Sequence, residues 1–203
     1  RFDTHCEEIL QSNGRASGVR LQGGETLRAD GVVFNGDTAA LRDGLLGQGA
    51  RAAMPAARKQ RSLSALTWSV LARTQGRSLD RHNLFFGQRY ASEFEDIFQH
   101  ARLPQDPTVY VCAQDRGAGA APAGYERLLC LVNAPAVGDS NPESLSAHAI
   151  ERCRQTSFAR LRQCGLEVEL DPARTVLTTP QQFHQRFPAT GGALYGQIGR
   201  ASC

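Results

Sequence analysis

Residues 62–73 read SLSALTWSVLAR, and this stretch decides what kind of fold the chain adopts. Apolar side chains alternate along it, so that Leu66, Trp68, Val70 and Ala72 fall on one face of a strand. A strand with an apolar face must bury that face against a second layer. The stretch therefore predicts a long strand within a sheet.

Further strands and helices follow this stretch along the chain. The predicted elements are strands over residues 83–86, 108–113, 127–132 and 167–170, a helix after Ser92 and a long helix over residues 142–164. Long strands joined by hairpins and by long connections favour an antiparallel or mixed sheet with helices on one face. The fold class expected for this part of the chain is therefore α+β.

The helix after Ser92 is expected to pack through its aromatic side. Ser92 and Glu95 match a capping box, and Phe94 and Phe98 lie on the apolar side of the helix. The acidic residues on its other side are expected to be solvated: Glu93, Glu95 and Asp96.

Residues 174–196, RTVLTTPQQFHQRFPATGGALYG, predict a strand, a helix and then a glycine loop. Thr179 and Pro180 suit the start of the helix. Gly191 and Gly192 then bring bare backbone to one place, where a large flat ligand could approach the main chain. A plain turn is the alternative interpretation of the glycine pair.

Residues 1–46 predict a smaller unit of strands followed by a helix. Asn13 and Gly14 form a strong hairpin signal. The apolar run GVVFN at residues 31–35 is typical of a strand buried on both faces, and Asp37 can cap a helix after it that extends through Leu45 and Leu46. Such a strand, turn and helix often form the edge of a nucleotide site, but the pattern lacks the defining GxGxxG.

Composition excludes several classes of protein. Among 203 residues, 41% are hydrophobic and 21% are charged, which is typical of a chain that buries a core. The net charge of +3 is too small to indicate a nucleic-acid partner. No apolar run is long enough to span a membrane, so we expect a soluble or peripheral protein. The basic cluster at residues 58–61 is either a solvated loop or a contact with an anionic membrane surface.

The six cysteines are expected to be reduced. Cys153 and Cys164 share a helical face, yet the rise of the helix separates them by roughly 16 Å, whereas a disulfide needs Cα atoms within about 7 Å. The sequence contains no CxxC and no His/Cys pairing at metal spacing, so no metal site is predicted. It also contains no GxSxG motif and no Cys/His signature. An enzyme built on this chain would therefore depend on a bound cofactor.

Several segments together resemble the bacterial carotenoid (phytoene) desaturase family of flavoproteins. The matching segments are residues 18–37, 66–72, 81–98, 107–116, 121–139 and 177–196, in an order and at a spacing that fit nearly the whole chain. Two of their sequences, TWSVLA and FPATGGALYG, most resemble the hydroxycarotenoid 3,4-desaturases, also called methoxyneurosporene dehydrogenases.

The resemblance implies an α/β flavoprotein fold of the amine oxidase type. Residues 1–61 would belong to the FAD-binding domain, residues 62–180 to the substrate-binding domain, and residues 181–203 to a return toward the FAD-binding domain. It also implies the reaction: two hydrogens leave a C–C bond of an acyclic, hydroxylated or methoxylated carotenoid, and the hydride passes to flavin N5. A cytoplasmic location, peripheral on the inner or photosynthetic membrane, is implied as well.

The sequence departs from the family in two places. It lacks the GxGxxG fingerprint, and residues 197–203 leave the family pattern. We therefore expect an internal fragment that binds FAD weakly or not at all. Two alternatives remain, an enzyme similar to the flavin amine oxidases and a non-catalytic module that binds lipid or carotenoid.

Site residues follow from the resemblance and from the surplus of aromatic residues, for which ordinary core packing is the alternative. No proton acceptor is predicted. The expected cofactor-binding residues are Cys6, Asn35, Asp37, Gly191 and Gly192. The expected substrate-binding residues are Trp68, Phe86, Phe94, Phe98, Tyr110 and Tyr195.

Overall fold

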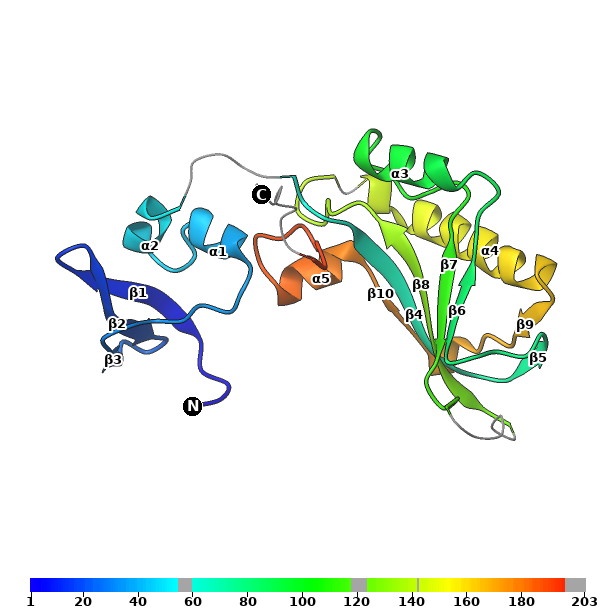
Figure 1. The fold of residues 1–203 in the computed structure, drawn as a ribbon, viewed down its shortest axis with the longest axis horizontal. Helices are drawn as coiled ribbons and strands as arrows, with labels where there is room; N and C mark the ends of the chain where they lie inside the picture. The colour runs from blue at the N-terminus through cyan, green and yellow to red at the C-terminus, as the bar shows by residue number, and fades with distance from the viewer. Residues whose placement is uncertain (55–59, 118–123, 142, 196–203) are drawn as a thin grey trace, which may run out of the picture. The chain divides into compact units, whose positions relative to one another are not determined.

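The computed structural model describes residues 1–54, 60–117, 124–141 and 143–195 (Figure 1). The chain divides into two compact units. The larger unit consists of Leu63–Arg186 and Gly191–Leu194, and the smaller one of the described residues of Arg1–Ser62 and Phe187–Thr190 together with Tyr195. Predictions for residues 58–59, 118–123 and 197–203 lie outside the described residues.

A five-stranded sheet forms the centre of the larger unit, with the strand order β10-β4-β8-β7-β6. Every neighbouring pair of strands in it is antiparallel. The strands are β4 (Ser64–Ala72), β6 (His82–Phe85), β7 (Val109–Ala113), β8 (Glu126–Ala134) and β10 (Thr175–Thr178). The predicted strand at residues 62–73 is thus confirmed, and it lies inside the sheet.

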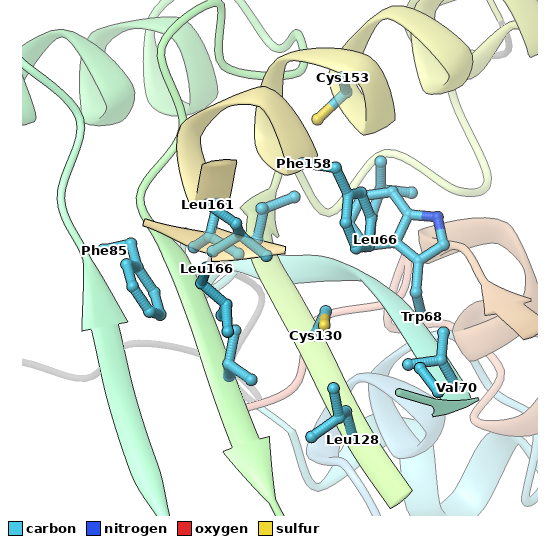
Figure 2. Close-up of a cluster of buried hydrophobic side chains, with 14 of the residues drawn as sticks. Leu66, Trp68, Val70, Phe85, Leu128, Cys130, Cys153, Phe158, Leu161 and Leu166 are labelled. Carbon is cyan, nitrogen blue, oxygen red and sulfur yellow. The ribbon is translucent and has the colours of Figure 1, made fainter. Parts of the chain in front are cut away.

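One face of this sheet is buried beneath a long helix, α4 (Ala147–Gln163). Trp68 of β4 pairs in register with Cys130 of β8, which pairs with Val111 of β7, and all three are almost completely buried. The Trp68 ring meets the edge of Phe158 on α4 at 5.7 Å between ring centroids (Figure 2). The expected α+β class, with an antiparallel sheet covered by a helix, is therefore confirmed.

Helix α4 begins later than the sequence predicts. Ser146 accepts a hydrogen bond from the Ala149 amide at 3.3 Å and caps the helix, while Glu143–Leu145 form a separate 3₁₀ turn. The helix ends before Gly165, whose φ of 82° suits a glycine. The chain then enters β9 (Leu166–Val168), which pairs with β5 (Thr74–Gly76) in a small second sheet.

The structure confirms the prediction for the start of the helix after β10. A short 3₁₀ turn, Pro172–Arg174, precedes β10, and α5 (Pro180–Arg186) follows it. Thr179 Oγ1 accepts from the Gln182 amide at 3.3 Å, and Gln182 Oε1 accepts from the Thr179 amide at 2.8 Å. Both bonds of a capping box are present.

In the smaller unit, three strands form an antiparallel sheet in the order β1-β2-β3. They are β1 (Cys6–Ser12), β2 (Arg15–Leu21) and β3 (Thr26–Arg28). Asn13 and Gly14 have φ values of 50° and 75°, as the predicted hairpin turn requires. Two short helices follow: α1 (Thr38–Arg42) and α2 (Gln48–Ala52).

Two predictions for this unit are wrong. The run at residues 31–35 is not a strand, and Val33 is 95% exposed. An apolar run becomes a strand only where another strand pairs with it, and no described residue does so here. The helix capped by Asp37 ends at Arg42, before the predicted residues Leu45 and Leu46, because Gly44 takes a φ of 79°.

Candidate functional site

The second face of the five-stranded sheet differs from the face beneath α4. Register places the residues of this face in rows across the strands. One row contains Val176, Ser69, Leu129, Cys112 and His82, and the neighbouring row contains Thr178, Thr67, Leu131, Tyr110 and Leu84.

Much of this face stays accessible and apolar. Leu71, Leu84 and Val176 are 40%, 58% and 63% exposed, and Leu129 and Leu131 are half-buried. We call this surface the open face and define it by Ser69, Leu71, His82, Leu84, Tyr110, Cys112, Leu129, Leu131 and Val176. An accessible apolar sheet surface is typical of a binding surface.

Two polar rings meet on the open face. The Nδ1 atom of His82 and the Oη atom of Tyr110 lie 2.6 Å apart, and the two rings stack with 15° between their planes. Burial raises the pKa of Tyr110, and a hydrogen bond with Cys112 raises it further, while the charge of Arg81 lowers it. The phenol is therefore protonated at neutral pH and can donate a hydrogen bond to the imidazole.

Helix α3 (Tyr90–Phe98) presents aromatic rings to its surroundings. Phe86, Tyr90 and Phe98 are 56%, 49% and 39% exposed. The ring of Tyr90 makes edge-to-face contacts with Phe86 at 5.5 Å and with Phe94 at 5.1 Å between centroids. The four residues, spaced four apart, form what we call the aromatic stripe: Phe86, Tyr90, Phe94 and Phe98.

The acidic side of α3 is buried, which corrects the prediction that these residues are solvated. Glu93 has no exposed surface, and its carboxylate accepts hydrogen bonds from the Thr108 amide at 2.9 Å and from Asn133 Nδ2 at 2.8 Å. Asp96 is 6% exposed and accepts from Arg102 and from the Gln105 amide. Of the three carboxylates, only Glu95 is exposed.

The predicted capping box of α3 is also wrong. The helix begins at Tyr90, and the hydroxyl of Ser92 donates to the Arg89 carbonyl at 2.7 Å instead of capping the helix. Ser92 therefore lies inside the first turn, where its hydroxyl bonds the preceding backbone.

The glycine pair is closely packed against other parts of the larger unit. Both Gly191 and Gly192 are buried, and the Gly191 carbonyl accepts from the Gly138 amide at 2.9 Å. A Cβ atom on Gly192 would lie 2.2 Å from the Pro180 carbonyl oxygen. The close approach that this glycine permits is thus to the start of α5. A flavin contact of Gly191 and Gly192 stays a prediction.

The other expected cofactor residues belong to the smaller unit. The Asp37 carboxylate accepts from the Ala39 amide at 2.8 Å and so caps α1. Asn35 is exposed, and the half-buried Cys6 donates to the Glu8 carbonyl at 3.6 Å. A flavin contact of Cys6, Asn35 and Asp37 stays a prediction.

The structure separates the expected substrate-binding residues of the larger unit. Trp68 lies in the core beneath α4, whereas Tyr110 lies on the open face. Phe86, Phe94 and Phe98 belong to the aromatic stripe. The remaining one, Tyr195, is 80% exposed in the smaller unit.

Sequence reasoning missed His82 as a site residue. The alternation in RHNLFF, residues 81–86, could have indicated it. In a strand, His82 lies on the same face as Leu84 and Phe86, and Phe86 is itself an expected substrate residue.

Within the described residues, no helix combines the length and the apolar character needed to cross a bilayer. The cysteines are free where the structure describes them, as predicted. Burial raises the pKa of both the Cys130 and the Cys153 thiol to about 12, so neither is a reactive thiolate at neutral pH.

The comparison with curated proteins gives relatives of one kind. The chain is 56% identical over 198 residues to a hydroxyneurosporene desaturase of Rubrivivax gelatinosus and 43% identical over 197 residues to one of Cereibacter sphaeroides. It is 30% identical over 199 residues to a 1-hydroxycarotenoid 3,4-desaturase of a Flavobacterium species. Each alignment covers 97% of this chain but only 37%, 39% and 39% of these relatives. The chain thus spans about two fifths of their length.

The chain was also compared with family models and with solved structures. No family model matches the chain. Among solved structures, an oxidoreductase of Methanosarcina mazei matches with a TM-score of 0.46 and 16% identity, covering 94% of this chain and 39% of that one.

Proposed function

We propose, from the homology of this chain to carotenoid desaturases over nearly its whole length, that it carries the substrate-binding sheet of such an enzyme. The whole protein would remove two hydrogens from a C–C bond of an acyclic carotenoid that carries a hydroxyl or methoxyl group. In this proposal, residues 1–61 belong to the FAD-binding domain and residues 62–180 to the substrate-binding domain. Residues 181–203 return toward the FAD-binding domain.

The open face is the observation that carries the proposal. A carotenoid is a long, flat and apolar molecule, and its burial against Leu84, Leu129 and Leu131 would remove apolar surface of both partners from water. A sheet is rigid, so it can also hold a polyene in one orientation, and orientation lowers the barrier of a reaction between bound groups. Tyr110 is the expected substrate residue that lies on this surface.

FAD is the cofactor that the relationship implies, and it would accept the hydride when bound. Since the chain spans about two fifths of its relatives' length, we propose that Cys6, Asn35, Asp37, Gly191 and Gly192 supply only part of the flavin contacts and that the remaining ones come from the portion that it does not span.

A membrane surface is the second partner that we propose, with the protein peripheral on its cytoplasmic side. The aromatic stripe supports this, because a Tyr ring suits the boundary between lipid and water and Phe rings can enter its apolar side. A carotenoid dissolves in the bilayer, so a substrate-binding unit that touches lipid can take it up directly. Phe86, Phe94 and Phe98 would then contact the polyene as it enters.

Pigment analysis tests the proposed reaction. The gene in its full reading frame is expressed in a host that accumulates hydroxyneurosporene, and the pigments are separated by chromatography with mass detection. The expected product is two mass units lighter and absorbs at longer wavelength, because one double bond joins the polyene. Unchanged hydroxyneurosporene in cells that contain the protein would contradict the proposal.

A non-catalytic module that binds carotenoid or lipid is the second candidate. One observation favours it: two of the expected flavin-binding residues already serve the fold. Asp37 caps α1, and Gly192 packs against the Pro180 carbonyl. A flavin absorption spectrum of the protein purified from its full reading frame distinguishes the two candidates: stoichiometric FAD would exclude the non-catalytic module, and absence of FAD would favour it.

A further inference from the structure

We propose that Tyr110 and His82 bind the oxygen of a hydroxylated polyene and distinguish it from the parent hydrocarbon. This inference rests on the proposed function, because it assigns a role to two residues of the open face. Neither the fold nor the core requires the pair, since His82 is exposed and Tyr110 is half-buried.

Two neighbouring strands hold the pair in place. On the β6–β7 ladder, His82 lies opposite Cys112 and Tyr110 opposite Leu84, so the two rings are diagonal neighbours on one face. Their centroids are 6.0 Å apart, and the 2.6 Å contact between Oη and Nδ1 fixes the angle of both rings. A ligand would therefore meet polar groups that are already oriented.

The pair has hydrogen-bonding capacity to spare. When Tyr110 donates its hydroxyl hydrogen to Nδ1, the neutral imidazole of His82 carries its own hydrogen on Nε2. Cys112 can donate to one lone pair of Oη, so the other lone pair can still accept a hydrogen bond from a ligand, and Nε2 can donate one. The Nε2–H bond points away from Tyr110, so a ligand hydroxyl either donates to Oη or accepts from Nε2, whereas a methoxyl oxygen can only accept from Nε2.

The surroundings make this pair selective. Leu84 lies opposite Tyr110 on β6, and Leu131 lies opposite it on β8. The titratable groups that face the phenol are His82, Cys112 and Arg81. A polyene that covers these apolar neighbours removes water from the pair, and a polar group that loses water without gaining a partner costs free energy. A hydroxylated polyene avoids that cost, while a hydrocarbon does not.

Ligand titration tests the inference. The purified protein is titrated with hydroxyneurosporene and with neurosporene in detergent micelles, and the shift of the carotenoid absorption bands reports binding. Tyr110→Phe keeps the ring and removes Oη, and His82→Phe removes both ring nitrogens. Each is expected to weaken binding of hydroxyneurosporene by about three- to tenfold, the range of one or two net hydrogen bonds, and to leave neurosporene unchanged or bound more tightly.

Two further variants serve as controls. Tyr125→Phe makes the same chemical change just before β8, at a ring that packs against the guanidinium groups of Arg73 and Arg174 and is remote from Tyr110 along the strand, and should alter neither affinity. Leu84→Ala should weaken both ligands equally. If Tyr110→Phe still binds both polyenes and its affinity for hydroxyneurosporene falls by less than twofold, this inference is overturned and the proposed function stays intact. If the unaltered protein bound neither polyene, both would fail.

Discussion

The carboxylate of Glu93 on α3 accepts a hydrogen bond from Asn133 on β8 at 2.8 Å, and Glu93 is completely buried. The bond joins residues 40 positions apart, and the Thr108 amide supplies a second one. Together they attach the acidic side of α3 to the sheet. The aromatic stripe lies on another side of the helix, where Phe94 is half-buried and Phe86, Tyr90 and Phe98 are exposed.

Glu93→Ala should be strongly destabilising. The substitution leaves the amide of the buried Thr108 and the side-chain amide of the half-buried Asn133 without their acceptor, and a fully buried group of this kind costs about 1–3 kcal/mol. Denaturant unfolding should therefore show a loss of about 3 kcal/mol or more. Glu95→Gln, on the exposed side of the same helix, should change stability by less than about 0.5 kcal/mol. Equal effects of the two substitutions would contradict the anchoring role of Glu93.

Phe158→Ala should also destabilise the larger unit. Phe158 is 4% exposed and packs its ring against Trp68, so its removal leaves a cavity beneath α4. Such a truncation costs about 3–5 kcal/mol. Tryptophan fluorescence can follow the unfolding, because Trp68 is the single tryptophan of the chain. Phe86→Ala, at a residue of the same unit that is 56% exposed, is the matched control and should cost much less.

Local patterns predicted those parts of the fold that depend on neighbours in sequence. The alternation at residues 62–73 indicated β4, because burial on one side imposes a period of two on a strand. The capping box at Thr179 and the hairpin turn at Asn13 likewise involve residues within three positions of each other. Each of these predictions needed no knowledge of distant contacts.

Long-range contacts decided the rest. The burial of Glu93 depends on donors 15 and 40 residues away, which no helical pattern reveals. The His82–Tyr110 pair depends on the register of β6 against β7. Residues 31–35 have the composition of a buried strand, but composition does not say whether another strand will pair with them.

Acid should weaken the unit partly through the buried pair of Arg116 and Glu126. Arg116 lowers the pKa of Glu126 by hydrogen bonding at 2.8 Å, and Thr74 also donates to this carboxylate. A carboxyl group whose pKa is lower in the folded state adds stability above its unfolded pKa of about 4.5 and loses it as pH falls through the folded pKa. Unfolding free energies measured from pH 7 to pH 2 should therefore decline below about pH 4.5, and more gently in Glu126→Gln.

Glu151 provides the contrast for that measurement. Arg154 lowers its pKa to about 2, but the carboxylate is exposed on α4 and is screened by salt. Glu151→Gln should therefore have little effect in 0.5 M salt, whereas Glu126→Gln should still destabilise by about 3 kcal/mol at pH 7, since it disrupts a buried pair. Salt that abolished both effects would show that the Arg116–Glu126 pair is accessible to solvent.

Gly192→Ala tests whether the glycine pair is needed for packing within the chain. Gly192 has a φ of 88°, which a residue with a Cβ atom rarely adopts, and the added atom would lie 2.2 Å from the Pro180 carbonyl oxygen. Gly23 has nearly the same φ, 92°, but nothing lies within 4 Å of its Cβ position. Gly23→Ala should cost about 1 kcal/mol from backbone strain alone, and Gly192→Ala should cost clearly more because the start of α5 must also move. Thermal unfolding of both variants measures the difference. Equal losses would mean that the loop relaxes away from Pro180, and the glycine would then be required only for its backbone conformation.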